Sequence, residues 1–179
     1  MALVRPARCP RCEAAATPLG GGVVLHGHGV RERQVWGPLT PDGEPQLTVV
    51  QVRRFRCTRC NKAVTVGPAE ALAGRLYTAS AIALALALYG LQQLASAAVR
   101  RWVSPARVVG ATSAARWQTL RRWCRALGTG RLFRGVRRVE GPPRQVAAAA
   151  AASLSAYALP SPEPPSLPAL AFLGAVHAG

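Results

Sequence analysis

The sequence predicts an α+β chain: a small antiparallel ribbon built on paired cysteines, then an all-α helix-turn-helix bundle and a disordered tail. Three observations carry this prediction. Two Cys-x-x-Cys pairs flank a β-rich segment, an alanine- and leucine-rich segment follows them, and prolines gather near the C-terminus. We expect boundaries close to residues 70 and 140, which divide the chain into units at 1–70, 71–140 and 141–179.

Four of the cysteines form two close pairs, Cys9 with Cys12 and Cys57 with Cys60. Two residues between the sulfurs let both thiolates of a pair reach one ion, and four thiolates satisfy a tetrahedral zinc ion. A redox dithiol needs one pair at the start of a helix in a βαβ unit, and structural disulfides are typical of secreted proteins. The pattern therefore favours a structural Zn²⁺ in a zinc ribbon.

The residues around the cysteine pairs are rich in β-branched side chains. Residues 23–36, 47–55 and 63–66 predict three or four antiparallel strands with the metal at one end. His26 and His28 fall in the first of these segments. Because four cysteines already close a tetrahedral site, we expect both histidines to be ordinary strand or turn residues.

The next segment has a helical composition. Residues 76–91 are almost wholly apolar or small, and alanine forms helices far better than strands. This run predicts a central buried helix, with a second helix or a continuation over 91–102. A membrane-spanning helix needs about 20 apolar residues. The run is shorter than that, so we expect no membrane partner.

Two helix starts then follow in quick succession. A Ser-Pro pair at 104–105 predicts the N-terminus of a short helix over 105–109, which Gly110 ends. A Thr-Ser pair at 112–113 caps a longer helix that runs to about Leu127. A short helix, a turn containing glycine and a longer basic helix form a helix-turn-helix, whose second helix enters the major groove of DNA.

Charge points to a polyanionic partner. The chain has 23 Lys and Arg against 7 Asp and Glu, a formal charge of +16, and no acidic residue between 71 and 139. Trp117, Leu120, Cys124 and Leu127 are spaced to form the core face of the longer helix, with Trp123 beside them. The candidate DNA contacts are Arg116, Gln118, Arg122 and Arg125 in the groove, and Arg100, Arg101 and Arg107 on phosphates.

Residues 9 to about 127 resemble the N-terminal region of insertion-sequence transposases and related DNA-binding proteins. The likeness rests on Val-Arg-Arg-Phe-Arg-Cys-Thr-Arg-Cys at 52–60 and on Leu-Arg-Arg-Trp at 120–123. It implies a zinc ribbon before a helix-turn-helix, with duplex DNA as partner. Such transposases cut DNA with three carboxylates that hold two metal ions. This chain has one aspartate, Asp42, and no glutamate in a strand–helix alternation, so we expect no enzymatic activity.

The C-terminal unit and the chain start complete the predictions. Residues 141–179 carry an alanine run at 147–152, which is compatible with a short helix, and several prolines, which predict a largely disordered tail. The first 17 residues lack the apolar core of a signal peptide, so we expect a cytoplasmic protein. The leading interpretation is a zinc-containing DNA-binding protein without a catalytic core. The alternatives are a zinc-ribbon module that binds RNA or protein, and a membrane-associated protein that uses residues 76–91.

Overall fold

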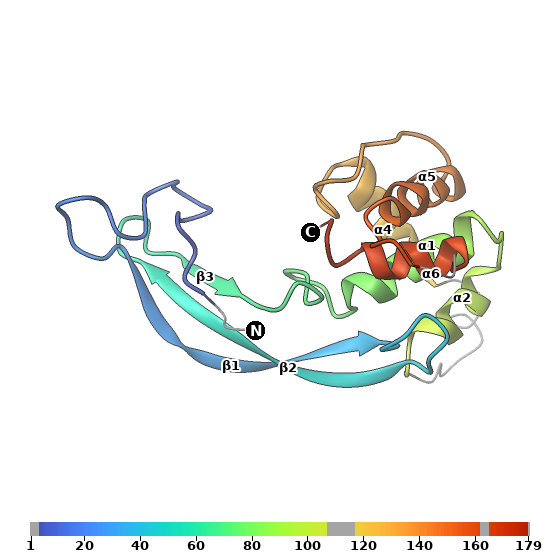
Figure 1. Ribbon diagram of the computed structural model, residues 1–179, viewed down its shortest axis with the longest axis horizontal. Coiled ribbons are helices and arrows are strands. Elements are labelled where there is room, and N and C mark those ends of the chain that lie inside the picture. Colours follow the sequence, from blue (N-terminus) through green and yellow to red (C-terminus); the bar gives the residue numbers. More distant parts are fainter. Residues whose placement is uncertain (1–3, 107–116, 162–164, 179) are drawn as a thin grey trace.

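The computed structural model describes residues 4–106, 117–161 and 165–178. Within them, a three-stranded antiparallel sheet and five helices form a mixed α+β structure, as the sequence predicts (Figure 1). The elements are β1 (Leu25–Gly37), β2 (Gln46–Cys57), β3 (Ala63–Val66), α1 (Ala79–Gly90), α2 (Ser96–Val103), α4 (Gln118–Gly128), α5 (Pro143–Ser155) and α6 (Leu167–Gly174).

Strands β1 and β2 form a long ribbon that separates the cysteines from the helices. Leu25 pairs with Cys57 at one end, and Gly37 pairs with Gln46 at the other. The register between β1 and β2 shifts between Gly27 and Val30. Strand β3 pairs only with the C-terminal end of β2, next to the second cysteine pair. In Figure 1 the cysteine-bearing loops lie at the left end of the ribbon and the helices gather at the right end.

Two hydrophobic cores stabilise the two ends of the molecule. The cysteine-end core consists of Cys9, Ala16, Leu25, Phe55, Cys57 and Val64. The helical core is larger and takes its side chains from all five helices and from the segments between them. The two clusters share no residue, so the two ends of the molecule have separate cores.

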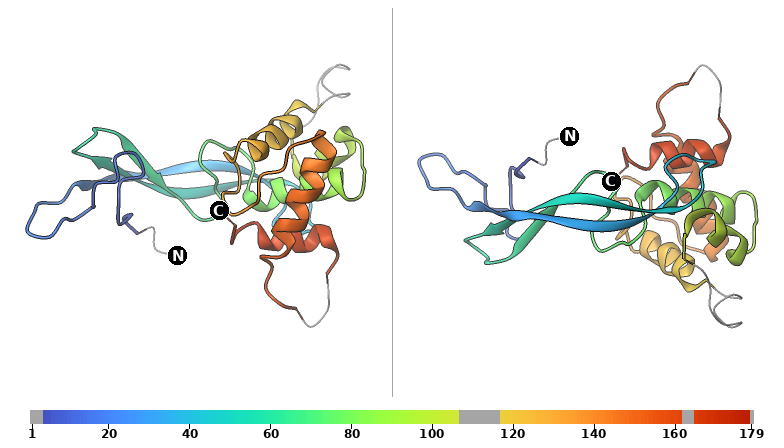
Figure 2. Two further views of the ribbon diagram at one scale, coloured as in Figure 1. Left: turned by 90° about the horizontal axis from the view of Figure 1, so that it is seen from above. Right: turned by 90° about the horizontal axis from the view of Figure 1, so that it is seen from below.

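Helix α1 is the centre of the helical part, as its all-round apolar sequence predicts. Thr78 begins it, because its hydroxyl oxygen accepts a hydrogen bond from the Ala81 N–H at 3.1 Å. Its side chains are buried on every face except at Tyr89. Helices α5 and α6 both pack against α1 and against each other (Figure 2), which explains why α1 has no polar face.

The prediction of a disordered tail is wrong for residues 143–155 and 167–174, which form α5 and α6. Prolines suggested a chain that does not fold, but Pro143 and Pro168 lie in the first turns of the two helices. A missing N–H costs nothing at that position, because the first N–H groups of a helix have no intrahelical partner. Ser166 caps α6 through a hydrogen bond from the Ala169 N–H.

The alanine run packs because its partner has no side chain. Ala147, Ala150 and Ala151 are buried, and the Gly90 backbone of α1 lies directly against the chain at Ala148. A second close approach occurs where Gly174 of α6 meets the Leu154 carbonyl. Small side chains at these contacts thus let three helices approach closely.

The predicted helix-turn-helix needs correction at the start of its longer helix. Helix α4 begins at Gln118, and Trp117 before it has an extended backbone with φ −76° and ψ 92°. The prediction that this helix already includes Trp117 is therefore wrong. Trp117 has an extended backbone, and its ring packs against other aromatic side chains. Pro105 and Ala106 are not helical either, and residues 107–116, with the predicted turn, lie outside the described residues.

An aromatic cluster joins the ribbon to the helices. Trp36 of β1, Tyr77 before α1, and Trp117 and Trp123 of α4 and its N-cap meet edge to face, with ring centroids 5.1–5.8 Å apart. Arg33 of β1 adds a polar tie, because its guanidinium donates to backbone carbonyls of residues 71–75. The ribbon therefore has a defined attachment to α1 and α4.

Candidate metal centre and basic surface

The structure brings the four predicted cysteines together at the end of the ribbon. The Sγ atoms of Cys9, Cys12, Cys57 and Cys60 all lie within 4.8 Å of one another. Cys9 Sγ is 3.8 Å from Cys60 Sγ, and Cys12 Sγ is 3.7 Å from Cys57 Sγ. A tetrahedral ion at about 2.3 Å from each sulfur needs sulfurs about 3.8 Å apart. The cluster is therefore positioned to hold one metal ion.

Two similar loops, here called the knuckles, present these sulfurs. In the first, the Cys9 N–H donates to the Ala14 carbonyl at 2.9 Å; in the second, the Cys57 N–H donates to the Lys62 carbonyl at 3.0 Å. The residue after each pair has a left-handed backbone, with φ 56° at Glu13 and 57° at Asn61. Both knuckles thus turn in the same way, although only Asn61 is a residue that tolerates this conformation well.

Hydrogen bonds and burial give the two thiols of the first knuckle different pKa values. A bond from the Arg11 backbone N–H is the main cause that lowers the pKa of Cys9 from 9.0 to about 7. Cys12 receives a comparable bond from the Ala14 backbone, but burial and hydrogen bonds with the other three cysteines raise its pKa to about 11. Near neutral pH, Cys9 is therefore the more readily ionised thiol of the pair, and Cys12 would give up its proton on binding a metal ion.

The fifth cysteine and the histidines are not part of this cluster. Cys124 is buried in the helical core, as predicted, and burial raises the pKa of its thiol to about 11, so it is a packing residue. His26 and His28 are exposed on β1 and lie outside the four-cysteine group, in agreement with their prediction as strand residues.

Helix α4 has one buried and one basic face. Leu120, Trp123, Cys124 and Leu127 are buried, as the sequence predicts. Gln118, Arg121, Arg122 and Arg125 are all exposed. Their spacing of three and four residues places these four side chains on one stripe, here called the α4 stripe. Three of the four were predicted from the sequence as DNA contacts, and Arg121 is the fourth, exposed in the same stripe.

The other predicted DNA contacts have different environments. Arg101 of α2 is exposed, whereas Arg100 is half-buried beside Tyr77, and its Nε has no hydrogen-bond partner among the described residues. Arg107 and Arg116 lie outside the described residues. After α4, the loop to α5 carries further exposed arginines that were not selected from the sequence: Arg131, Arg134, Arg137 and Arg138.

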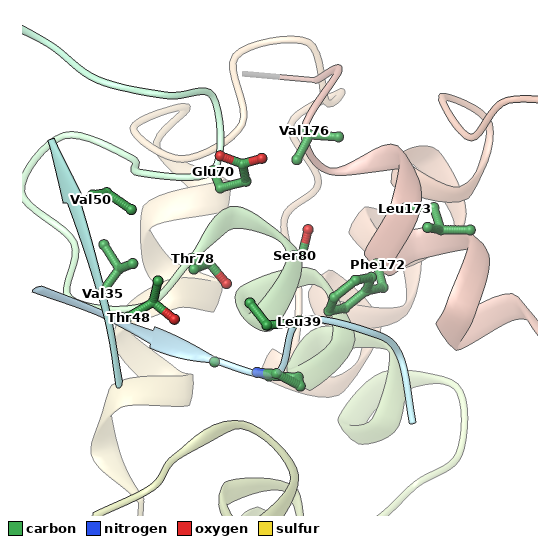
Figure 3. A pocket seen from close by; sticks show the side chains of 12 residues that line it. Val35, Leu39, Thr48, Val50, Glu70, Thr78, Ser80, Phe172, Leu173 and Val176 are labelled. Atoms are coloured by element: carbon green, nitrogen blue, oxygen red, sulfur yellow. The ribbon is translucent and has the colours of Figure 1, made fainter. Parts of the chain in front are cut away.

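A cavity of about 390 Å³ lies between the base of the ribbon and the C-terminal helix. Figure 3 shows Val35 of β1 and Phe172 of α6 on opposite sides of it, with Glu70 and the start of α1 between them. Its lining is mostly apolar, and Glu70 is the one ionisable residue that lines it. The Thr78 hydroxyl already caps α1.

No helix in the described part of the chain combines the length and apolar character needed to cross a bilayer. Comparison of the chain with protein-family models, curated proteins and solved structures finds no match.

Proposed function

We propose that this chain is a zinc-containing protein that binds duplex DNA through the α4 stripe and has no catalytic role. The observation that carries the proposal is the alignment of Gln118, Arg121, Arg122 and Arg125 on one exposed face of a helix whose opposite face is buried. The helix is thereby held by its apolar side while its cationic side stays available to a partner.

The chemistry of the cysteine cluster supports zinc as a structural ion. Four sulfurs at tetrahedral spacing form a closed site with no position for water or substrate, which is typical of structural and not of catalytic zinc. Soft thiolate ligands favour zinc over magnesium, calcium or manganese. The small size of the cysteine-end core also supports this role, because such a unit needs metal binding for its stability.

The charge and shape of α4 support duplex DNA as the partner. An α-helix fits the major groove, where arginine can bind guanine through two hydrogen bonds and glutamine can bind adenine in the same way. Residues 71–139 contain no acidic side chain, and Glu140, which lines one hollow with Arg121 and Arg125, sets a single negative charge against the three arginines of the stripe. This proposal rests on α4 alone. We also propose that α4 is the second helix of a helix-turn-helix related to the DNA-recognition region of transposases, and this part depends on residues 107–116.

A second candidate function is a module that binds RNA or protein through the ribbon. Val30, Leu47 and Val49 favour it, because these side chains are 46–56% exposed. The strand register places all three on one face of the ribbon. Exposed apolar residues grouped on a sheet face are common in protein interfaces.

The test measures zinc content and duplex binding on one purified sample over a range of salt concentrations. We expect one zinc per chain and an affinity that falls steeply as salt rises. The double variant R122Q/R125Q should weaken binding to the preferred duplex and lower the slope of log K against log salt by up to about 1.8, because it removes two cationic charges from the DNA surface and each neutralised phosphate contributes about 0.9. The matched variant R122K/R125K should keep most of the slope and lose preference among sequences, because lysine lacks the planar fork of arginine.

Two results would contradict the proposal. An unchanged affinity and salt slope in R122Q/R125Q would exclude the α4 stripe as the contact surface. Zinc binding without any duplex binding, together with capture of single-stranded RNA, would favour the second candidate.

A further inference from the structure

The two knuckles share more than their cysteines. Each has the local sequence Arg-Cys-x-Arg-Cys, with Arg8 and Arg11 in the first and Arg56 and Arg59 in the second. The strand pairing is equivalent as well, since Arg8 lies opposite Ala15 and Arg56 opposite Ala63. Two copies of one basic loop therefore surround the metal centre.

The two arginines of each knuckle differ in their hydrogen bonds and exposure. Arg8 donates to the Glu13 carbonyl at 3.4 Å, and Arg56 donates twice to Asn61 Oδ1, at 2.9 and 2.7 Å. These contacts fold the first arginine of each knuckle over its own turn. Arg11 and Arg59, in contrast, are exposed and stand between the cysteines of each pair. Their guanidinium groups have donors available to a ligand.

We propose that the end of the ribbon is a second phosphate-binding surface, here called the knuckle surface. It rests on the proposed function, and its ligand is the sugar–phosphate backbone of the duplex that the α4 stripe binds. The knuckle surface consists of Arg8, Arg11, Arg54, Arg56, Arg59 and Lys62.

The simplest competing role for these arginines is to neutralise the metal centre. A zinc ion with four thiolates carries a charge of about −2. Six cationic side chains, set against Glu13 and this doubly negative centre, leave an excess of about three positive charges at this end of the chain. Neutralisation of the cluster therefore accounts for only part of the charge, and the remainder attracts a polyanion.

A groove connects the knuckle surface with the region beyond α4. It has a volume of about 660 Å³, and Arg11, Arg33 and Arg134 line it together with apolar and small residues. Arg33 uses its guanidinium on the carbonyls of residues 71–75. Arg11 from the first knuckle and Arg134 from the loop after α4 are both exposed, so two cationic side chains from different parts of the chain line this groove. A single phosphate backbone can thus contact both parts of the chain.

The position of the knuckle surface makes it separable from α4 by experiment. The six residues of the knuckle surface belong to the two cysteine loops and to β2, and none of them belongs to α4. Substitutions at the knuckles therefore leave the α4 stripe unchanged. Sequence is read at base edges, so loss of a phosphate contact weakens binding to every duplex equally.

The test compares R11Q/R59Q with R11K/R59K in the full-length zinc-loaded protein, using duplexes of several sequences. We expect R11Q/R59Q to lower the salt slope by about 1.8 for every duplex while one zinc per chain is retained. R11K/R59K should keep the wild-type slope, because it retains both charges. If R11Q/R59Q loses zinc, the pair R54Q/K62Q replaces it, with the same expected change.

The outcomes separate this proposal from the function on which it rests. If the knuckle variants bind like wild type while R122Q/R125Q loses slope, the knuckle surface is excluded and duplex binding through α4 stands. If neither set changes the slope, both proposals fail. A slope change that occurs with single-stranded RNA and not with duplex DNA would overturn the choice of duplex.

Discussion

Replacement of Gly90 by alanine tests whether α5 packs against α1. A Cβ added at Gly90 would lie 2.7 Å from Ala148 Cα and 2.8 Å from the Ala147 carbonyl carbon. Both are backbone atoms and cannot rotate away. Normal carbon–carbon contact is about 3.5 Å, so the two helices must separate by roughly 0.8 Å to accept the methyl group.

The size of the effect follows from two opposing terms. Overpacking of a tight core costs about 1–3 kcal/mol. Alanine gains up to about 1 kcal/mol over glycine in a helix, and less at the last position. We therefore expect the free energy of unfolding to fall by about 1–2 kcal/mol. In a chain of this size each kcal/mol shifts Tm by about 2–4 °C, so Tm should fall by about 2–8 °C.

The assay is thermal unfolding followed by circular dichroism at 222 nm, with Gly22→Ala as control. A Cβ at Gly22 meets no atom within 4 Å, so its Tm should stay close to the wild-type value. If the alanine-rich segment did not pack on α1, Gly90→Ala would leave only the gain in helix propensity. A rise in Tm would therefore refute the packing described for α5.

Three further predictions concern the metal centre and the helical core. Cys57→Ser should abolish stoichiometric zinc binding and unfold the ribbon end, and chelation of the metal from the wild-type protein should have the same effect on the ribbon. Ellipticity at 222 nm should persist, because the helical core is separate. Loss of zinc binding together with loss of this ellipticity would contradict two independent cores. Metal affinity should fall by far more than tenfold from pH 8 to pH 6, because Cys9, with its pKa lowered to about 7, contributes about tenfold, and Cys12, with its pKa raised to about 11, must give up its proton to the metal over the whole range. Competition with a metal-binding dye measures this, and a flat profile would contradict binding by thiolates. Arg144→Ala should reduce the free energy of unfolding in urea by about 1.5–3 kcal/mol. The substitution removes a 2.8 Å hydrogen bond to the Tyr89 carbonyl and a guanidinium stacked 4.4 Å from the Tyr89 ring centroid. As a control, substitution of the exposed Arg121 by alanine should change the free energy of unfolding by less than about 0.5 kcal/mol.

The cysteine end of this protein could be predicted well because its signals are local. Two Cys-x-x-Cys pairs and β-branched segments next to them are enough to expect a metal site beside antiparallel strands. The positions of β1, β2 and β3 confirm the antiparallel strands, and the four cysteines form a cluster that could hold a metal ion. The repeated left-handed turn at Glu13 could not be predicted from residue type, because the fold of the knuckle imposes a conformation that glutamate rarely adopts.

The helical part was harder to predict because its stability depends on contacts between distant segments. An alanine run has a strong helix propensity but only a small apolar surface, so its order depends on Gly90, more than 50 residues earlier in the chain. Trp117 was correctly expected to be buried, yet its helical conformation was wrong. The aromatic cluster with Trp36 and Tyr77 provides the burial without a helix at that position.

The aromatic cluster gives the protein a built-in optical probe. Three of its four tryptophans, Trp36, Trp117 and Trp123, belong to this cluster or its adjoining segments, whereas Trp102 is 42% exposed. Intrinsic fluorescence therefore reports mainly on the junction where β1 meets α1 and α4. Separation of the ribbon from the helices will hydrate these indoles and shift their emission to longer wavelengths, so movement between the metal-bearing arm and α4 can be followed without any label.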